Sequence, residues 1–288
     1  MIDRSETASP EGASRPFRLP VIFGIVNITH DSFSDGGRFL EPEAAVAHGR
    51  KLLSDGADIL DLGAAASNPK AGTVSPEEEI ARLAPVVSAL KQTGTLLSID
   101  TFAPEVQRWA VEQDIAYLND IHGFAEPEFY PALADSGAGL VVMHAVQERG
   151  RATSMDVPPE STFQRILEFF DGRIAALERA GVERSRLILD PGMGLFLGNR
   201  VEASFEVLRR LPALKAAFNL PILISVSRKS FLRRAAKRGI AEAGFATLAA
   251  ELFAVLQGAD YIRTHDPAAL ADGLAVWAAA LTGNTTSS

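Results

Sequence analysis

Short runs of apolar residues alternate along the chain with longer stretches in which apolar positions recur every three or four residues. The short runs, several of them β-branched, predict strands at 21–26, 59–60, 96–99, 117–118, 140–143, 187–189, 222–226 and 261–262. The stretches between them predict amphipathic helices. Such alternation indicates parallel strands, and eight units of this kind in roughly 250 residues match a closed (β/α)8 TIM barrel of the α/β class.

Three of the predicted helices have clear boundaries or faces. Ser75 can cap the first, Pro76 suits its first position, and Glu78 would complete a capping box. The apolar faces are formed by Ile80, Leu83, Ala84, Val87 and Leu90; by Ile166, Phe169, Phe170, Ile174 and Leu177; and by Leu248, Leu252 and Val255. Gly181 and Gly258 follow the second and third helices as breakers.

An open, doubly wound sheet is the alternative to the barrel. Such a sheet usually carries a G-x-G-x-x-G loop after its first strand, whereas this chain has Asn27, Ile28 and Thr29 there. We therefore expect one barrel domain at 19–281, between disordered tails at 1–18 and 282–288.

Composition excludes several classes of protein. The 288 residues are 47% hydrophobic and 22% charged, which argues against disorder, and apolar runs fall short of the roughly 18 residues of a membrane helix. The absence of cysteine excludes disulfides, thiolate nucleophiles and cysteine-ligated metals. A net charge of −8 argues against a surface for nucleic acid or acidic lipid. Residues 1–18 lack the apolar core of a signal peptide, so we expect a cytoplasmic protein.

Polar residues follow the predicted strands. The carboxyl ends of barrel strands meet at one mouth, so these residues should gather there. They are Asn27, Asp61, Asp100, Asn119, Asp120, His144, Asp190, Ser227, Arg228, Lys229, Arg263 and His265. A single Asp or Asn at such a position often only caps the next helix, but this many charges at one rim need a ligand to offset their desolvation. A small, polar, charged ligand is indicated.

The residue types suggest two halves of that ligand. Asp190 and Asn119 suit the hydrogen-bonding edge of a heterocycle. Arg263, His265 and Asn27 suit a phosphate-like anion with its Mg²⁺ ion.

Further groups extend this site. Lys229 could serve either half, and Ser230 begins a predicted helix whose free N–H groups suit a carboxylate. The basic run at 228–238 is interpreted as a solvated helix face, because no aromatic platform for nucleic acid accompanies it. Met143 fits core packing on pattern alone.

Ordered motifs at these strand ends resemble those of dihydropteroate synthase over nearly all of residues 21–281. The motifs are GIVNIT (24–29), DSFSDGG (31–37), SIDT (98–101), NDI (119–121), VMH (142–144), LDPG (189–192), SRKS (227–230) and RTHD (263–266). The resemblance implies a (β/α)8 barrel, typically a homodimer. It also implies Mg²⁺-dependent condensation of 6-hydroxymethyl-7,8-dihydropterin diphosphate with p-aminobenzoate, which releases diphosphate and gives 7,8-dihydropteroate.

The resemblance also implies roles for individual residues. The pterin would be held by Asp100, Asn119, Asp190 and Lys229, with Met143 against its ring. The diphosphate would be held by Arg263 and His265, with Asn27 on the magnesium. The catalytic residues would be Asp100, Lys229, Arg263 and His265. The segment 31–37 would close over the site, with Phe33 against p-aminobenzoate.

Two segments depart from the ordinary family pattern. GAAASNP at 63–69 stands where most members have GGESTRP, and MGLFLG at 193–198 is longer than the usual GFGF. Both belong to the p-aminobenzoate side, whose contacts would be Phe33, Ser67, Pro69, Leu195, Phe196 and Ser230.

These departures resemble those of the mobile sulfonamide-resistance synthases. Added bulk near Leu195 and Phe196 would exclude the sulfonyl and N-substituent of the drug more than the small, flat p-aminobenzoate. A sulfonamide-insensitive enzyme is therefore expected, with loop drift in a housekeeping enzyme as the alternative.

Two other functions are alternatives to dihydropteroate synthesis. A pterin-binding methyltransferase domain would not need the diphosphate motifs at 227–229 and 263–265, which are intact. A non-catalytic pterin-binding paralogue should have lost Asp100 or Lys229, and both are present.

Overall fold

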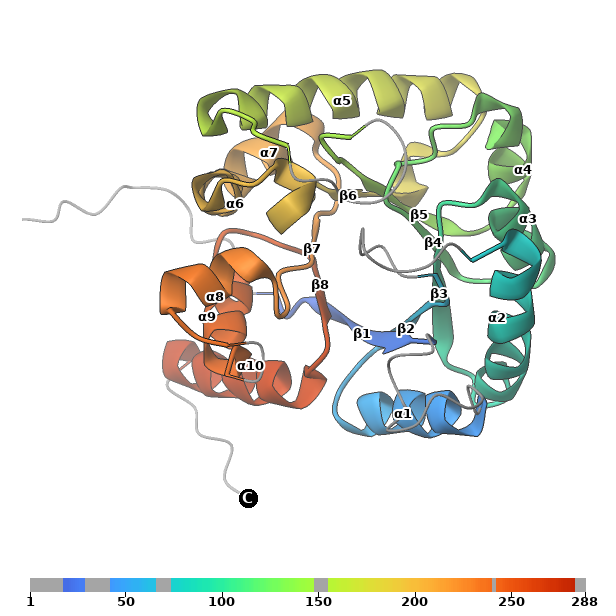
Figure 1. The fold of residues 1–288 in the computed structure, drawn as a ribbon, viewed down its shortest axis with the longest axis horizontal. Coiled ribbons are helices and arrows are strands. Elements are labelled where there is room, and N and C mark those ends of the chain that lie inside the picture. Colours follow the sequence, from blue (N-terminus) through green and yellow to red (C-terminus); the bar gives the residue numbers. More distant parts are fainter. Residues whose placement is uncertain (1–17, 29–41, 66–73, 148–154, 240–241, 283–288) are drawn as a thin grey trace, which may run out of the picture.

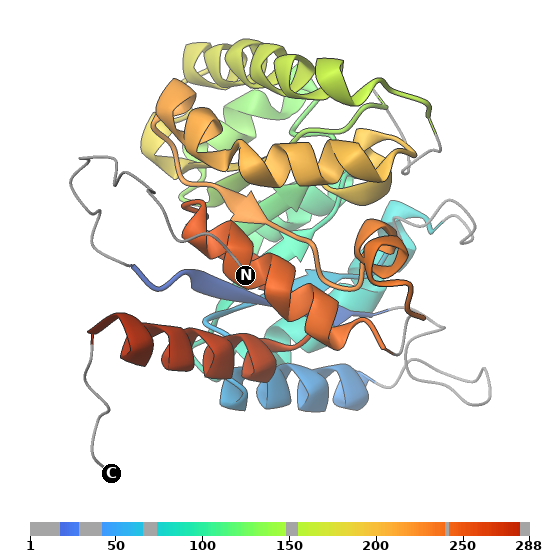
Figure 2. The same ribbon diagram turned by 90° about the vertical axis from the view of Figure 1, so that its left-hand side faces the viewer.

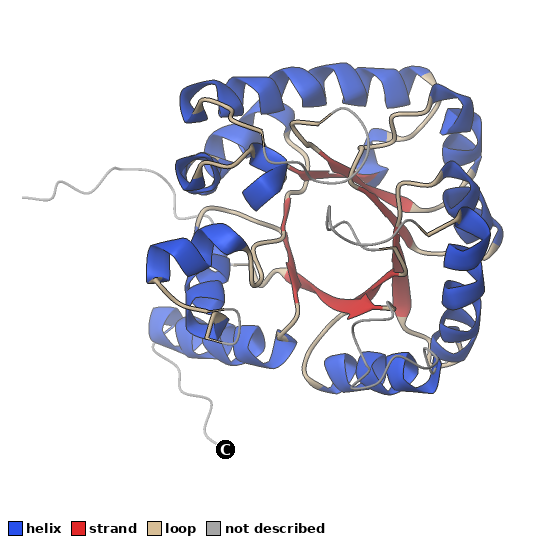
Figure 3. Cartoon of the chain, in the orientation of Figure 1, coloured by secondary structure: helices blue, strands red, loops and turns tan. Residues whose placement is uncertain are grey.

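The computed structural model describes residues 18–28, 42–65, 74–147, 155–239 and 242–282. Eight strands form one parallel sheet in the order β6-β5-β4-β3-β2-β1-β8-β7. The strands are β1 (Val21–Asn27), β2 (Ile59–Gly63), β3 (Leu96–Asp100), β4 (Tyr117–Asp120), β5 (Gly139–Met143), β6 (Leu187–Asp190), β7 (Leu223–Ile224) and β8 (Tyr261–Thr264). A parallel bridge between Leu189 and Ile222 joins the two ends of the sheet. Figure 1 looks along the barrel, and Figure 3 shows the strands as an inner ring within the helices.

Helices follow the strands and cover the outside of the barrel. They are α1 (Pro42–Ser54), α2 (Pro76–Lys91), α3 (Pro104–Glu112), α4 (Tyr130–Asp135), α5 (Pro159–Arg179), α6 (Val201–Arg209), α7 (Leu211–Phe218), α8 (Ser230–Ala236), α9 (Gly244–Leu256) and α10 (Pro267–Thr282). Short 3-10 turns lie at η1 (Pro127–Phe129), η2 (Arg184–Arg186) and η3 (Gly194–Leu197). None of the described helices is long and apolar enough to cross a membrane.

The (β/α)8 barrel predicted from the sequence is confirmed. β1 lies between β2 and β8, and its Asn27 pairs with Gly63 of β2 while its Val21 pairs with Tyr261 of β8. β7 is shorter than expected, two residues instead of five.

The start of α2 confirms one half of the predicted capping box and corrects the other. Ser75 Oγ accepts the Glu78 N–H at 3.2 Å, as a cap should. The Glu78 carboxylate, however, pairs with Arg82 one turn along the helix and not with the cap backbone. A partner at i+4 on the same helix face competes for the carboxylate, and here it wins.

The barrel interior is divided along its axis. Phe23, Ile59, Val141, Ile188 and Leu223 form an apolar cluster that fills one end. Tyr117 and Tyr261 pack edge-on against Phe23, with ring centroids 5.5 and 5.7 Å away. This packed end is closed, so a ligand can enter the barrel only from the other.

Candidate active site

Strand alternation places a ring of polar side chains directly above the apolar cluster that fills the closed end of the barrel. Side chains two residues apart point to the same side of a strand. Four residues that belong to this cluster or pack against it are each followed at this spacing by a polar residue: Ile59 by Asp61, Tyr117 by Asn119, Ile188 by Asp190 and Tyr261 by Arg263. The polar ring therefore lies at the carboxyl ends of the strands, as predicted.

Arg263 occupies the centre of this ring and joins two carboxylates. Its Nε donates to Asp61 Oδ2, and its Nη2 donates to Asp100 Oδ2 at 2.6 Å. Asp61 is fully buried, whereas the side chains of Arg263 and Asp100 are 16% and 24% exposed. A cation from β8 thus holds acids from β2 and β3, with one face of the group open to the mouth.

Asp61 also receives a hydrogen bond from Asn119 Nδ2 at 3.2 Å. Asp61 is one of the polar residues predicted at a strand end, but no motif in the sequence predicts a role for it. Asp61 Oδ1 and Asn119 Oδ1 are buried, and neither has a hydrogen-bond partner among the described residues. Buried acceptors without donors are uncommon in folded proteins, so these two atoms indicate donors supplied by a ligand or by water.

Burial and charge perturb both members of the Asp100–Arg263 pair. Burial raises the pKa of Asp100 to about 7 against the opposing effect of Arg263, and the nearby carboxylate of Asp61 adds to the rise. Burial alone would lower the pKa of Arg263, but Asp61 and Asp100 outweigh it and raise that pKa. Arg263 is therefore a permanent cation, while Asp100 is poised to change charge near neutral pH.

A second acid and base lie on the other side of the mouth. Asp190 Oδ1 accepts the Gly192 N–H at 2.8 Å, and burial raises the pKa of Asp190. Burial lowers the pKa of Lys229 to about 8, against the attraction of Asp190. Lys229 Nζ donates to the Met193 carbonyl at 3.1 Å. The two side chains affect each other's charge without a direct hydrogen bond.

A histidine and a serine connect the ends of β7 and β8. Ser227 Oγ accepts the backbone N–H of His265 at 3.2 Å and lies 3.0 Å from His265 Nδ1. Burial lowers the pKa of His265 to about 3, and Arg228 and Arg263 contribute in the same direction. His265 is therefore neutral at physiological pH, with Nδ1 turned toward Ser227.

The loop that carries Lys229 has a strained backbone. Arg228 lies in the left-handed region at φ 59°, which is uncommon outside glycine. The buried Thr247 of α9 accepts the Arg228 N–H through Oγ1 at 3.1 Å. Strain of this kind is concentrated at functional sites, where surrounding contacts enforce it.

The loop after β6 carries Leu195 and Phe196 and borders Lys229. The Phe196 ring centroid lies 5.0 Å from Lys229 Nζ, within the range of a cation–π contact. Leu195 is among the exposed large apolar residues. The longer MGLFLG segment therefore places an aromatic ring against the base and an aliphatic side chain toward solvent.

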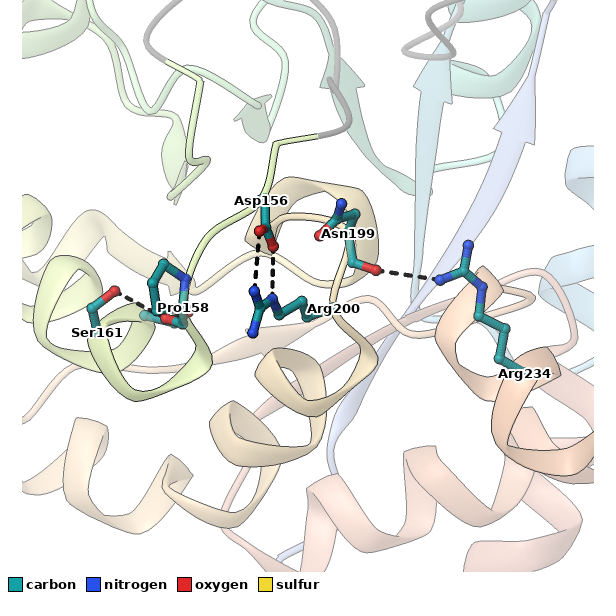
Figure 4. Close-up of polar contacts among 7 residues, drawn as sticks. Asp156, Pro158, Ser161, Asn199, Arg200 and Arg234 are labelled. Atoms are coloured by element: carbon teal, nitrogen blue, oxygen red, sulfur yellow. Dashed lines mark hydrogen bonds and ion pairs between the residues drawn. The ribbon is translucent and has the colours of Figure 1, made fainter.

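Contacts with two other parts of the chain hold the far end of this loop (Figure 4). Arg200 donates to both oxygens of Asp156, at 2.6 and 3.0 Å. Arg234 of α8 donates to the Asn199 carbonyl at 3.2 Å, and Asn199 N–H donates to the Met155 carbonyl at 2.8 Å. The loop is thus tied both to the segment before α5 and to α8.

Two residues predicted to face the mouth do not. The Asp120 carboxylate accepts from the backbone of His122 and Phe124 and from Gln107, so it holds the loop after β4. His144 is buried with Nδ1 3.2 Å from the Pro191 carbonyl and its ring against Phe169 of α5. The expectation was wrong for both, because each comes directly after an inward position, Asn119 or Met143, and successive side chains of a strand point to opposite sides.

The remaining predicted residues divide into two sets. Asn27 is exposed at the end of β1, and Met143 pairs in register with Asp190 at the end of β5. Ser230 is the first residue of α8. Phe33, Ser67 and Pro69 lie outside the described residues.

No cluster of three or more His, Asp or Glu side chains able to hold a metal is found within the described ranges. Asn27, exposed at the end of β1, offers one amide oxygen as a metal ligand. Mg²⁺ commonly takes one or two protein oxygens, with waters and substrate phosphates completing its octahedron. The donor set fits a magnesium ion that enters together with a phosphorylated ligand.

Comparison with known proteins agrees with this geometry. The family model described as "Pterin binding enzyme" matches residues 23–265. The chain is 57% identical to dihydropteroate synthase type-2 of Escherichia coli, covering 90% of this chain and 95% of the relative. It is 52% identical to dihydropteroate synthase type-3 of Escherichia coli, with 88% and 97% covered. The structure of a Xanthomonas albilineans dihydropteroate synthase in complex with 7,8-dihydropteroate matches with a TM-score of 0.79, 37% identity and coverages of 91% and 94%.

Proposed function

The chain belongs to the dihydropteroate synthases of the pterin-binding enzyme family. From this premise we propose how its residues divide the reaction, and we propose that sulfonamides inhibit it poorly. The synthase joins p-aminobenzoate to the methylene group of 6-hydroxymethyl-7,8-dihydropterin diphosphate. The observation that carries the proposal is the Asp61–Arg263–Asp100 group beside the unpartnered acceptors of Asn119 and Asp61. It places fixed positive charge, titratable negative charge and empty acceptors at one mouth.

Bond breaking precedes bond making in the proposed reaction. The methylene carbon–oxygen bond breaks first, and its electron pair leaves with the diphosphate. The positive charge left on the pterin is opposed by Asp100, whose open face lies toward the mouth. The aniline nitrogen of p-aminobenzoate then attacks the carbon and loses one proton. Electrostatic stabilisation and positioning therefore account for most of the rate enhancement.

The pterin is proposed to lie between Asn119, Asp190 and Lys229. Its amino-pyrimidinone edge has N–H donors, which match Asn119 Oδ1 and the second oxygen of Asp190. Lys229 supplies a donor for the ring acceptors, and Met143 supplies a polarizable contact for the ring face. The edge of the heterocycle would thus satisfy groups that the protein leaves unpaired.

The diphosphate is proposed to lie against Arg263 and His265. The Nη1 donors of Arg263 have no acceptor among the described residues, and His265 is neutral with one ring nitrogen turned away from Ser227. Asn27 would bind Mg²⁺, which supplies Lewis-acid neutralisation of charge on the leaving diphosphate when bound. Asn27→Ala should therefore raise the magnesium concentration needed for half-maximal rate about tenfold. An unchanged magnesium requirement would contradict this assignment.

p-Aminobenzoate is proposed to enter along the loop of Leu195 and Phe196, toward Ser230 at the start of α8. Its flat carboxylate would accept hydrogen bonds from the first N–H groups of that helix, with Phe33, Ser67 and Pro69 as further contacts. A sulfonamide has a tetrahedral sulfonyl group and a bulky N-substituent at the same place. The Phe196 ring, held beside Lys229, would exclude that substituent by volume.

Selective exclusion can be measured with Phe196→Ala. We expect the inhibition constant for sulfamethoxazole to fall about tenfold, while the KM for p-aminobenzoate changes less than threefold, because the smaller substrate never filled the excluded volume. Phe205→Ala removes a ring of the same size from the adjacent helix α6 and serves as the matched control. Equal changes in both constants would show that Phe196 does not discriminate.

A homodimer is proposed through α9 and α10. Figure 2 shows these helices side by side on one flank of the barrel. Phe245, Leu256 and Val276 on this flank are 90%, 62% and 72% exposed. Exposed large apolar side chains on two neighbouring helices are the basis for proposing that a second copy binds this flank. Phe245→Glu should shift the mass measured by light scattering from dimer to monomer, and a monomeric parent protein would refute the proposal.

A further inference from the structure

A basic cleft lies along α8, and apart from Ser230 the proposed reaction assigns no role to its residues. The cleft has a volume of about 480 Å³ and is lined by Ser230, Arg233, Arg234, Lys237 and Arg238. The sequence pattern alone predicts only a solvated helix face here. In the structure, four cations share one cleft whose lining contains no carboxylate.

Most of the positive charge in this basic cleft has no counter-charge. Within the described part of the chain, Arg238 is the one lining cation with a carboxylate partner, Glu242 Oε1 at 3.5 Å. Arg233 is half-buried, and its Nε is buried without an acceptor. Lys237, at the end of the helix, is exposed and has no ion pair within the same residues. Unpaired cations that share a cleft attract anions.

The basic cleft begins beside the loop that borders p-aminobenzoate. Ser230 and Arg234 also line a small second cavity, whose other walls include Leu195 and Gly198. Arg234 donates to the Asn199 carbonyl at 3.2 Å, which ties α8 to the end of this loop (Figure 4). The basic cleft therefore continues outward from the place proposed for the carboxylate of p-aminobenzoate.

The charge of the basic cleft is opposite to that of the whole chain. The sequence has 28 Lys and Arg against 36 Asp and Glu, a net charge of −8, so the molecule as a whole repels anions. p-Aminobenzoate is an anion at neutral pH, because carboxyl groups ordinarily ionise near pH 4. A cleft lined by one sign of charge reverses the local field and concentrates ligands of the opposite sign.

We propose that the basic cleft attracts the carboxylate of p-aminobenzoate and makes the enzyme select anionic over neutral arylamines, with Arg233 and Lys237 as the residues that set this preference. The inference rests on the proposed position of p-aminobenzoate beside Ser230. Neither cation is placed at the reacting atoms, so the cleft should affect KM for p-aminobenzoate and not kcat.

The test neutralises the two cations that have no partner. Arg233→Gln combined with Lys237→Gln removes two positive charges, while Arg234 and Arg238 keep their contacts. Arg233→Lys combined with Lys237→Arg keeps both charges and changes both side-chain shapes. This charge-conserving variant separates an effect of charge from an effect of packing.

A matched control removes the same charge elsewhere. Arg50 on α1 and Arg179 on α5 are exposed, so Arg50→Gln combined with Arg179→Gln changes the net charge equally at a distance from the basic cleft. The neutral probe is p-aminobenzamide, which has nearly the shape of p-aminobenzoate without its charge. KM for p-aminobenzoate and the inhibition constant of p-aminobenzamide are measured at saturating pterin diphosphate and Mg²⁺, in about 20 mM and about 300 mM KCl.

In the dilute salt, the glutamine variant should raise KM for p-aminobenzoate about fivefold. Its kcat and its inhibition constant for p-aminobenzamide should stay within about twofold of the parent values. In the concentrated salt, KM of the parent should rise toward that of the glutamine variant, because salt screens the cleft. The charge-conserving variant and the matched control should behave as the parent does.

Two results would overturn the inference. An unchanged KM in the glutamine variant would leave α8 with a solvated face only. Equal rises in KM and in the inhibition constant of p-aminobenzamide, or a raised KM in the charge-conserving variant, would show a structural effect instead of attraction. Absence of product from the parent protein would contradict the synthase assignment itself, so the two failures are distinguishable.

Discussion

Removing the guanidinium of Arg263 should destabilise the protein more than any other single change at the mouth. Arg263→Met keeps a flexible apolar side chain but deletes both charge-assisted hydrogen bonds, to Asp61 and to Asp100. Asp61 is fully buried and would keep only the amide of Asn119 as a partner. Breaking a buried ion pair by removing one member typically costs about 3–5 kcal/mol, because an uncompensated charge stays behind.

The size of this loss should depend on pH in a defined direction. The pKa of Asp100 in the folded parent is about 7, and loss of its cationic neighbour can only raise it further. Below that pH the variant can hold Asp100 protonated and so remove one of the two unpaired charges. The loss of unfolding free energy should therefore be smaller at pH 5.5 than at pH 8.

A second substitution identifies the cause. In the Arg263→Met background, Asp61→Asn removes the stranded charge and should recover about 2 kcal/mol at pH 8, although the same change in the parent should destabilise it. Urea unfolding of the parent, both single variants and the double variant, followed by circular dichroism, gives the coupling energy. Additive effects within about 0.5 kcal/mol would refute the account of Arg263 as the bridge.

Three further outcomes are expected. Gly192→Ala should lower the unfolding free energy by at least about 2 kcal/mol, because φ is 75° and an added Cβ would lie 2.3 Å from the His144 carbonyl oxygen. In the same urea titration, Gly172→Ala at an exposed position within α5 should raise the unfolding free energy by about 0.5–1 kcal/mol. Asp100→Asn should lower kcat about a hundredfold or more. In the parent, kcat/KM should rise with pH through about 7 as Asp100 ionises. If kcat/KM of the variant rises over the same pH range, a group other than Asp100 causes the rise. The pKa of buried His144 is about 4, below its unfolded value, so this residue stabilises the fold above pH 6.5 and that contribution is lost as the pH falls toward 4. His144→Gln should therefore flatten the dependence of the thermal midpoint on pH between pH 6.5 and 4. An unchanged slope would contradict this role of His144.

The sequence predicts the barrel and its polar ring because both depend on short-range patterns. A strand's inward positions repeat every second residue, so Ile59 and Asp61, or Tyr261 and Arg263, are fixed relative to each other once the strand is recognised. The same rule would have selected Met143 over His144 at the end of β5, where choosing the first polar residue failed.

The partners of the charged groups could not be read from the sequence. Arg263 pairs with acids 202 and 163 residues away, and only closure of the barrel brings them together. Glu78 could pair either with the cap backbone or with Arg82, and in the structure it pairs with Arg82. Lys229 and Phe196 meet because two loops from different strands converge. Contacts of this kind follow from tertiary geometry, which local propensity does not encode.

The most direct measurement is the formation of 7,8-dihydropteroate by the full chain, quantified by mass spectrometry during a sulfamethoxazole titration. The mixture contains 6-hydroxymethyl-7,8-dihydropterin diphosphate, Mg²⁺ and p-aminobenzoate, with p-aminobenzoate omitted in the control. The account predicts product that depends on p-aminobenzoate and persists when the drug is in large excess over it. Absence of product would contradict the assignment of the mouth, and loss of product at drug concentrations near that of p-aminobenzoate would contradict selective exclusion by the Leu195–Phe196 loop.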